Sequence, residues 1–358
     1  MSGLLDPPYG ERDRFGMAAR IAGIPAQIGE ALARLAERPW PAPPRPPARL
    51  AVGGMGGSAI AADLTRGLYE DRLPRPLEVV RGYRWPGWVG GDALTLLSSY
   101  SGETEETLAL YRDAGGRGAM RLALSTGGTL GACCARDGVF VHPLPPGSPP
   151  RAALFSSWVA LTGLLHALGW VEDPAPGWRE AAARLAEREA ELGPAVPETR
   201  NPAKRLARGL AGRLVYLYAG SGPLEAVALR WRQQLHENAK LLAHSAVVPE
   251  LDHNEIVGWE RPGALHRGIA VVVLHDPEDA PEIRTRLTLT GEYARRQGAA
   301  VHEWEAAPGP RLARLASLVQ FGDYLSLYLA LLAGADPTPI ASIDAFKRRL
   351  ATQGDSPA

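Results

Sequence analysis

The sequence has very little cysteine: only Cys133 and Cys134 occur among its 358 residues. Adjacent cysteines cannot close an ordinary intrachain disulfide, and they lack the spaced pairs that bind metals. The pattern therefore excludes a disulfide framework and a cysteine-based metal centre. We expect a protein that needs no metal and no cofactor.

The chain also lacks an excess of charge and a long apolar run. Lysine plus arginine equals aspartate plus glutamate at 39 each, so nothing indicates a nucleic-acid partner. No apolar run approaches the length of a membrane span, and the N-terminus lacks the apolar core of a signal peptide. We expect a soluble, cytoplasmic protein with no membrane partner.

Lysine is scarce as well. The chain has only Lys204, Lys240 and Lys347, against 36 arginines. Where arginine serves nearly every general cationic role, a retained lysine is more often needed as a compact ammonium.

Most of the sequence alternates between continuous apolar strands and helices, the pattern of parallel sheets covered on both faces. An amphipathic helix is predicted over 12–38, followed by a stiff proline-rich connector at 39–50. The expected strands lie near 49–53, 77–81, 94–99, 120–124, 138–142, 214–218, 246–248, 269–274 and 299–304. The main helices are expected near 58–70, 104–115, 128–136, 223–242, 281–297, 311–333 and 342–351, with a broken helical region at 151–211.

Residues 51–64 and 216–229 are both a strand, a Gly/Ser loop and a helix, which is a weak internal repeat. The expected fold class is α/β, with two related doubly wound parallel-sheet domains and helical connections. The predicted organisation is an N-terminal helix and connector (1–48), a first domain (49–150), connecting helices (151–211), and a second domain with a C-terminal helix (212–358).

The most informative stretch is TLLSSYSGETEET at 95–107. A strand ends in a run of hydroxyls, a glycine permits a tight turn, and a helix starts near Glu103. Hydroxyl donors, free backbone N–H groups and a helix N-terminus suit a phosphate monoester. The alternative is a well-capped helix. The hydroxyl-bearing candidates are Ser98, Ser99, Ser101 and Thr104.

A second glycine-rich loop, GGMGGS at 53–58, also joins a strand to a helix, with Ser58 as the expected N-cap. Its spacing fits neither the dinucleotide fingerprint nor a P-loop. Glycine lets the backbone approach a ligand closely, although tight strand–helix packing explains the loop as well. Both loops follow strand carboxyl ends, where ligands of open α/β sheets bind, so we expect them to face one pocket.

Three further residues are acid, base or cation candidates. Glu237 lies in RWRQQLHENAK on a predicted helix, where a solvated pair with Lys240 is the plainer interpretation. His253 lies in LDHNEIVGWE and could shuttle a proton or belong to a helix cap. Arg151 follows two prolines and is either a helix-start arginine or a cation for a developing oxyanion.

Together these segments resemble a known family. SYSGET resembles the SxSGxT hallmark of sugar isomerase (SIS) domains, which many phosphosugar proteins share. GGMGGSA, PPRAAL, RWRQQLHENAK, DHNEI and IDAFKRRL, in this order from about 50 to 350, resemble the bifunctional phosphoglucose/phosphomannose isomerases of archaea and bacteria. ENAK followed by DHNEI is the more specific part of the match.

The resemblance implies an aldose–ketose isomerase that converts glucose 6-phosphate, mannose 6-phosphate or both to fructose 6-phosphate through a cis-enediol(ate). Glu237 would be the base, Arg151 would stabilise the enediolate, and His253 and Lys347 would assist ring opening. The family is dimeric, and the histidine typically comes from the partner subunit. The residues implied to hold the phosphate are Gly57, Ser58, Ser99, Ser101 and Thr104.

The sequence departs from the family at two positions. Glu103 stands where the family usually has Asn, and its carboxylate would repel a phosphate unless it points away. Because acids in a helix first turn commonly face outward, we expect Glu103 to have little effect. His236 replaces a smaller polar residue, with no evident consequence.

Three other functions remain open. A phosphosugar sensor on the same fold needs the phosphate contacts but no base, so the presence of Glu237, His253, Arg151 and Lys347 disfavours it. An enzyme of glucosamine 6-phosphate synthesis is disfavoured because no N-terminal cysteine nucleophile or glutaminase-like domain precedes the sugar-binding unit. A dinucleotide-dependent dehydrogenase is disfavoured by the glycine spacing.

Overall fold

The computed structural model describes residues 3–261 and 263–354, and it contains two all-parallel sheets. The first has the strand order β2-β1-β3-β4-β5 and the second the order β7-β6-β8-β9. The strands are β1 (Arg49–Gly54), β2 (Leu77–Val80), β3 (Ala93–Ser98), β4 (Met120–Ser125), β5 (Val141–Pro143), β6 (Leu214–Gly220), β7 (Ala243–Val248), β8 (Ile269–His275) and β9 (Ala300–Glu305).

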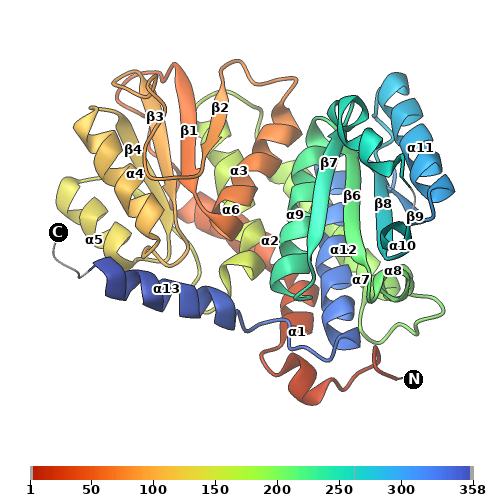
Figure 1. Cartoon of the computed structure of the whole chain (residues 1–358). Helices are drawn as coiled ribbons and strands as arrows, with labels where there is room; N and C mark the ends of the chain where they lie inside the picture. The colour runs from red at the N-terminus through yellow and green to blue at the C-terminus, as the bar shows by residue number, and fades with distance from the viewer. Residues whose placement is uncertain (1–2, 262, 355–358) are drawn as a thin grey trace.

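Helices cover both faces of each sheet (Figure 1), as continuous apolar strands require. The longer helices are α1 (Met17–Ala22), α2 (Ile24–Glu37), α3 (Gly56–Tyr69), α4 (Glu105–Gly116), α5 (Gly128–Asp137), α6 (Leu154–Ala167), α7 (Ala175–Leu192), α8 (Pro202–Leu210), α9 (Pro223–Glu237), α11 (Pro281–Arg296), α12 (Arg311–Leu332) and α13 (Ala341–Gly354). The short ones are η1 (Gly10–Asp13), η2 (Pro150–Ala152), η3 (Glu250–His253), η4 (Glu255–Trp259) and α10 (Ala264–Arg267).

The layers follow from the alternation of side chains along each strand. Leu50 and Val52 of β1 belong to a large central cluster that also contains Val215 and Leu217 of β6. Ala51, one residue away, belongs to a separate cluster on the outer face of the first sheet. Helices α3, α6, α9 and α12 therefore form a central layer between the sheets, with α4 and α5 outside one sheet and α11 outside the other (Figure 1).

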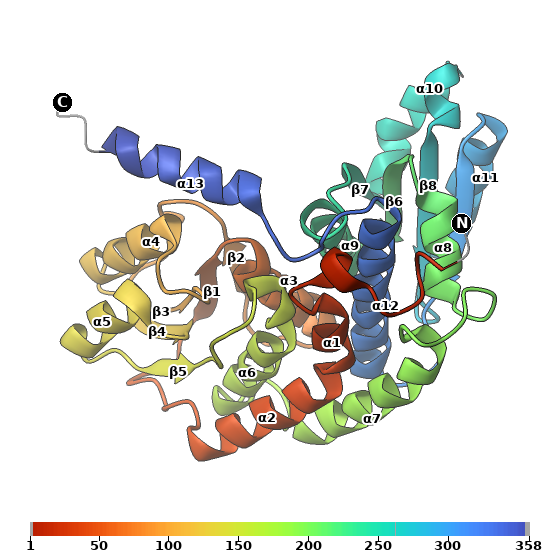
Figure 2. The same cartoon turned by 90° about the horizontal axis from the view of Figure 1, so that it is seen from below.

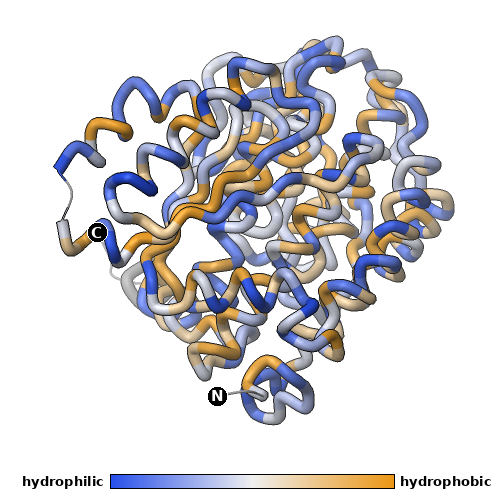
Figure 3. Tube along the Cα trace, turned by 90° about the vertical axis from the view of Figure 1, so that its right-hand side faces the viewer, coloured by the Kyte–Doolittle hydropathy of each residue, from blue (hydrophilic) through white to orange (hydrophobic). Residues whose placement is uncertain are grey.

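Hydropathy follows the same layers. Figure 3 shows hydrophobic segments concentrated in the interior and hydrophilic ones on the outer turns and helices. The helix α12 is long and apolar enough to cross a membrane by length and composition, yet nearly all of it is buried within this fold. The sequence pattern predicts no apolar stretch close to the length of a membrane span, and α12 is an exception to that prediction. It is a central helix of the core.

The α/β class with two parallel sheets is confirmed, while some details of the expected elements differ. The strand expected near 138–142 is the shorter β5, Val141–Pro143. The helix expected over 12–38 is η1, α1 and α2, with breaks at 14–16 and at Gly23. The strand expected at 246–248 begins at Ala243, because it pairs along β6 from Val215 onward. The helix expected over 223–242 ends at Glu237, so Lys240 lies outside it.

Candidate active site

The candidate site lies at one end of the seam between α3 and α9. A Cβ at Gly57, near the start of α3, would lie 3.0 Å from the Arg151 backbone nitrogen. Arg151 in turn binds Asn238 at the end of α9. At the other end of α3, a Cβ at Gly67 would lie 3.1 Å from Cα of Pro223, where α9 begins. The two helices therefore run antiparallel, which places the first sheet's carboxyl edge beside the end of α9.

The two predicted loops meet at this edge. The Tyr100 N–H donates to Ser58 Oγ at 3.1 Å, and the Ser98 hydroxyl donates to the Ser58 carbonyl at 2.8 Å. The expectation that Ser58 is an N-cap is wrong: α3 begins at Gly56 after Met55, with no side-chain cap. Ser58 is instead the link between the loops, because β1 and β3 are neighbouring strands.

The loop hydroxyls are arranged mainly as internal acceptors. Ser101 Oγ accepts from the Glu103 N–H at 3.2 Å, and Thr104 Oγ1 accepts from the buried Ser99 hydroxyl at 3.0 Å. Thr104 occupies the N-cap position of α4, but its side chain makes no capping bond. Within the described residues, Ser58, Ser101 and Thr104 donate no hydrogen bond of their own, so three O–H donors remain for a ligand.

Glu103 points out of the loop, as expected. Both of its carboxylate oxygens accept bonds from Thr129 in the first turn of α5, from the backbone N–H and from the hydroxyl, each at 2.7 Å. These bonds stabilise the ionised form and hold the pKa of Glu103 below its usual value. The carboxylate is engaged by a second helix N-terminus.

Arg151 is buried between the two parallel-sheet halves of the chain, with 2% of its surface exposed. Its Nη2 donates to the carbonyls of Pro337 (2.8 Å) and Thr338 (2.7 Å), and Nη1 lies 3.3 Å from Glu237 Oε2. Burial lowers the pKa of Arg151, and the Glu237 carboxylate opposes that effect. The alternative that Arg151 is only a helix-start arginine does not explain why its guanidinium points at the Glu237 carboxylate.

Glu237 is the last residue of α9, and its side chain is 24% exposed. The expected solvated pair is absent: Lys240 Nζ binds the Glu237 carbonyl, and the described residues show no ion pair between the two side chains. The amide of Asn238 accepts from Arg151 Nε at 2.6 Å and donates to Ser326 at 3.0 Å. This side chain fixes Arg151 against α12.

A buried polar network supports this arrangement from behind. Arg230 donates to Asp323 at 2.9 Å and to the Arg151 carbonyl at 2.8 Å, and Gln234 donates to Asp323 at 2.7 Å. Burial raises the pKa of Asp323, while the Arg230 cation lowers it. Asn238 and this network were missed from sequence. The polar positions within RWRQQLHENAK, spaced at one helical turn, were the available signal.

A pocket of about 510 Å³ opens beside Glu237. Its walls come from the end of α9 and from the segment that leads into α13. Its volume lies in the range of ordinary small-ligand sites. The lining residues are His236, Glu237, Lys240 and Pro339–Ile343.

The structure does not bring His253 to this pocket. Glu237 lies before β7 and His253 follows its carboxyl end, so the strand separates them by about 20 Å. His253 is exposed, and no hydrogen bond or ion pair of its ring occurs within the described part of the chain. Its neighbours have structural partners: Asp252 binds Arg286 and Thr290, and Glu255 accepts from the Tyr218 hydroxyl.

Lys347 lies on α13, which stands apart from the first sheet and its helices (Figure 2). Its side chain is exposed, and the described residues offer it no hydrogen-bond or ion-pair partner. The helix starts at the wall of the Glu237 pocket, so Lys347 is about 9 Å further along its axis. One side of α13 exposes Ile343, Phe346 and Leu350, the last two by 66% and 42%.

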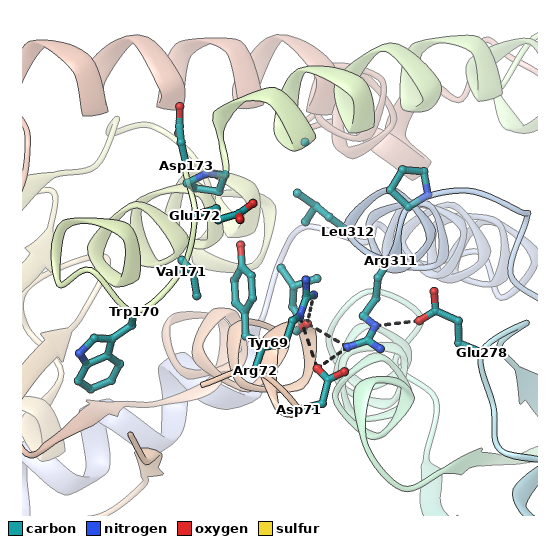
Figure 4. A pocket seen from close by; sticks show the side chains of 14 residues that line it. Tyr69, Asp71, Arg72, Trp170, Val171, Glu172, Asp173, Glu278, Arg311 and Leu312 are labelled. Carbon is teal, nitrogen blue, oxygen red and sulfur yellow. Dashed lines mark hydrogen bonds and ion pairs between the residues drawn. The ribbon is translucent and has the colours of Figure 1, made fainter. Parts of the chain in front are cut away.

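A larger depression, of about 670 Å³, lies at the opposite end of the seam and contains none of the expected site residues. Figure 4 shows Arg311 between two carboxylates from the two halves of the chain, with Asp71 Oδ1 2.7 Å away and Glu278 Oε2 3.0 Å away. The bond from Arg311 lowers the pKa of Asp71. We interpret the depression as a groove between the two sheet-bearing halves of the chain that is crossed by a salt bridge.

Comparison with known proteins identifies relatives of this chain. A family model described as "Bacterial phospho-glucose isomerase C-terminal SIS domain" matches residues 199–350. A crystal structure of a glucose-6-phosphate isomerase like protein from Thermus thermophilus has a TM-score of 0.60 at 24% identity, covering 94% of this chain and 95% of its own, and shares the fold.

Two curated relatives carry the name bifunctional phosphoglucose/phosphomannose isomerase. The protein from Caldicellulosiruptor bescii is 40% identical over 85% of this chain and 89% of its own length. The protein from Aquifex aeolicus is 31% identical over 83% of this chain and 88% of its own. This chain belongs to the family of bifunctional phosphoglucose/phosphomannose isomerases.

Proposed function

We propose that this protein interconverts fructose 6-phosphate with glucose 6-phosphate and mannose 6-phosphate, with Glu237 as the base. The observation that carries the proposal is the Glu237 carboxylate, 3.3 Å from the buried Arg151 guanidinium and open to a pocket of about 510 Å³. The names of the relatives support the same reaction.

The proton transfer uses two groups in contact. On the open-chain sugar, Glu237 removes the proton from C2 of the aldose and returns it to C1, while the hydroxyl proton moves from O2 to O1. The enediolate that forms between these steps carries negative charge on oxygen. Four hydrogen-bond acceptors hold the Arg151 guanidinium in place. Its Nη1 can therefore stabilise the negative charge of the enediolate without moving.

The phosphate is anchored by the loop at the first sheet's carboxyl edge. Ser58, Ser101 and Thr104 supply O–H donors, Ser99 braces Thr104 from behind, and Gly57 lets α3 approach Arg151 closely. The N-terminus of α4 adds a favourable potential for a dianion. Anchoring the far end of the substrate orients C1 and C2 for Glu237.

The test is a coupled assay with fructose 6-phosphate that follows glucose 6-phosphate and mannose 6-phosphate separately. Glu237→Gln keeps the shape but removes the proton acceptor, so kcat should fall by roughly 10²-fold or more for both products. The matched control is Glu225→Gln, an exposed glutamate at the other end of α9, which should retain wild-type kcat. Near-normal turnover by Glu237→Gln would contradict the assignment.

The competing proposal is a phosphosugar sensor. A sensor would bind a phosphosugar through the same loop but turn over neither product. Binding of 5-phosphoarabinonate, an open-chain anion that resembles the enediolate, together with zero turnover by the wild-type protein would favour the sensor.

We also propose a homodimer in which the partner subunit supplies His253 to each site. In support, Glu237 precedes β7 and His253 follows its carboxyl end, so the two lie at opposite ends of a strand about 20 Å long, and α13 exposes an apolar stripe for a second subunit to cover. Both His253 and Lys347 assist ring opening in this proposal, with Lys347 carried by α13.

Mixing subunits tests the dimer directly. A heterodimer of Glu237→Gln and His253→Ala subunits contains one site with both native residues if His253 crosses the interface. Random mixing should then restore about a quarter of wild-type activity. If each chain used its own histidine, the mixture would stay inactive. A cytoplasmic location remains a prediction from the sequence.

A further inference from the structure

Lys240 has an unusual backbone directly beyond α9. Its φ is 56°, and among the described residues it is the one non-glycine with a positive φ. Glycine or asparagine is usual in this left-handed conformation after a helix, because a larger side chain is strained there. A strained backbone conformation of this kind persists only where contacts with the surrounding structure stabilise it.

The reason is the position of its ammonium. Lys240 Nζ donates to the carbonyls of Glu237, Pro337 (3.2 Å) and Pro339 (2.7 Å). An ammonium has three donors, and all three are used here. The side chain therefore joins the end of α9 to the connector that runs from α12 to α13. Partial burial and the nearby Arg151 cation lower the pKa of Lys240.

Arg151 holds the same connector from its other side. Its Nη2 binds the carbonyls of Pro337 and Thr338. Three consecutive carbonyls, at 337–339, are thus bound by two cations that flank Glu237. The chain then enters the pocket wall at Pro339–Ile343 and continues into α13.

We propose that Lys240 is a positioning residue: it clamps the connector so that Arg151 and Glu237 keep their mutual geometry and α13 stays at the pocket. The catalytic part of this proposal rests on the isomerase function proposed above. The clamp explains why a lysine stands here in a chain with 36 arginines. A compact ammonium can point at three converging carbonyls, whereas a planar guanidinium cannot.

The kinetic test compares three variants on fructose 6-phosphate. Lys240→Met should lower kcat by about 10- to 100-fold, the scale expected for misplaced catalytic groups, while KM changes less than about threefold. Lys240→Arg should be intermediate, because its fork reaches only some of the carbonyls. Lys240→Gly removes the ammonium and also the backbone strain. Its kcat should fall as much as that of Lys240→Met, while its melting temperature should equal or exceed that of Lys240→Met.

A second measurement does not depend on activity. Hydrogen–deuterium exchange of peptides covering 333–350 should be faster in Lys240→Met than in wild type, while peptides of α7 exchange equally in both. If the wild-type protein proves inactive, the proposed function fails but this comparison still tests the clamp. Unchanged exchange over 333–350, or unchanged kcat in both Lys240→Met and Lys240→Gly in an active enzyme, would overturn the proposal.

Discussion

Gly57→Ala tests the contact that joins the phosphate loop to the rest of the site. A Cβ at this position would lie 3.0 Å from the Arg151 nitrogen, 3.1 Å from the Pro150 carbonyl carbon and 3.2 Å from Cα of Arg151. Ordinary van der Waals contact begins at 3.4 Å, so the start of α3 and the Arg151 backbone must separate by about 0.4 Å. All three contacts are backbone atoms, which cannot rotate away as a side chain would.

The cost should appear mainly in turnover. Displacements of about 1 Å in an active site can cost 10²-fold, so a shift of this size should lower kcat about five- to tenfold. Overpacking costs about 1–3 kcal/mol, and alanine recovers up to about 1 kcal/mol of it by replacing a helical glycine, so the melting temperature should fall only slightly.

The assay is steady-state kinetics with fructose 6-phosphate, together with thermal unfolding. Gly29→Ala in α2 is the matched control, because no atom lies within 4 Å of its Cβ position. That variant should be slightly stabilised and fully active. If Gly57→Ala matched Gly29→Ala in kcat, the packing of α3 against Arg151 would have no influence on the chemistry, and our account of the site would be refuted.

Ser101→Ala and Thr104→Ala should each weaken binding of a phosphosugar inhibitor by about 1.5–3 kcal/mol, measured by calorimetry, if each hydroxyl donates to a charged phosphate. Equal affinity of the double variant and wild type would make the loop a structural cap. Glu103→Asn should leave inhibitor affinity nearly unchanged even at low salt, because the carboxylate is directed at Thr129; a large gain would show that it faces the phosphate. His142 is 2% exposed and stacks on Trp40, and burial lowers its pKa to about 4. Between the ordinary value of about 6.5 and pH 4 the unfolded chain binds more protons, so the free energy of unfolding should fall by about 3 kcal/mol as the pH drops through this window. Chemical denaturation of His142→Phe should lack this part of the pH dependence, and an identical pH profile would contradict the assignment.

Much of the fold could be predicted because continuous apolar strands and helices alternate regularly. The sheets, their parallel direction and most helix positions followed from local pattern. The end of α9 did not, because it is set by tertiary partners: Asn238 bonds to Arg151 and Ser326, and Lys240 bonds to the α12–α13 connector. All of these partners are far from α9 in the sequence, so the local pattern of residues around α9 could not predict where the helix ends.

The site shows the same division. The position of each loop after a strand predicted that both lie at one edge of the sheet, and the hydrogen bond between Ser58 and Tyr100 confirms that they meet. Sequence could not show that Ser58 links the loops instead of capping α3, since both roles need the same hydroxyl. The scarcity of lysine was informative: Lys204 and Lys240 each direct an ammonium at several backbone carbonyls. Only Lys240 does so beside Glu237.

The central helical layer has a thermodynamic consequence. Apolar side chains from β1 and from β6 belong to one continuous cluster, so neither sheet has a separate core on its inner face. Cutting the chain between α8 and β6 would leave each half with a large apolar face exposed to water, and each half would lose much of the burial that offsets its chain entropy. The two sheets should therefore unfold together in one cooperative transition, although the sequence presents them as two similar units.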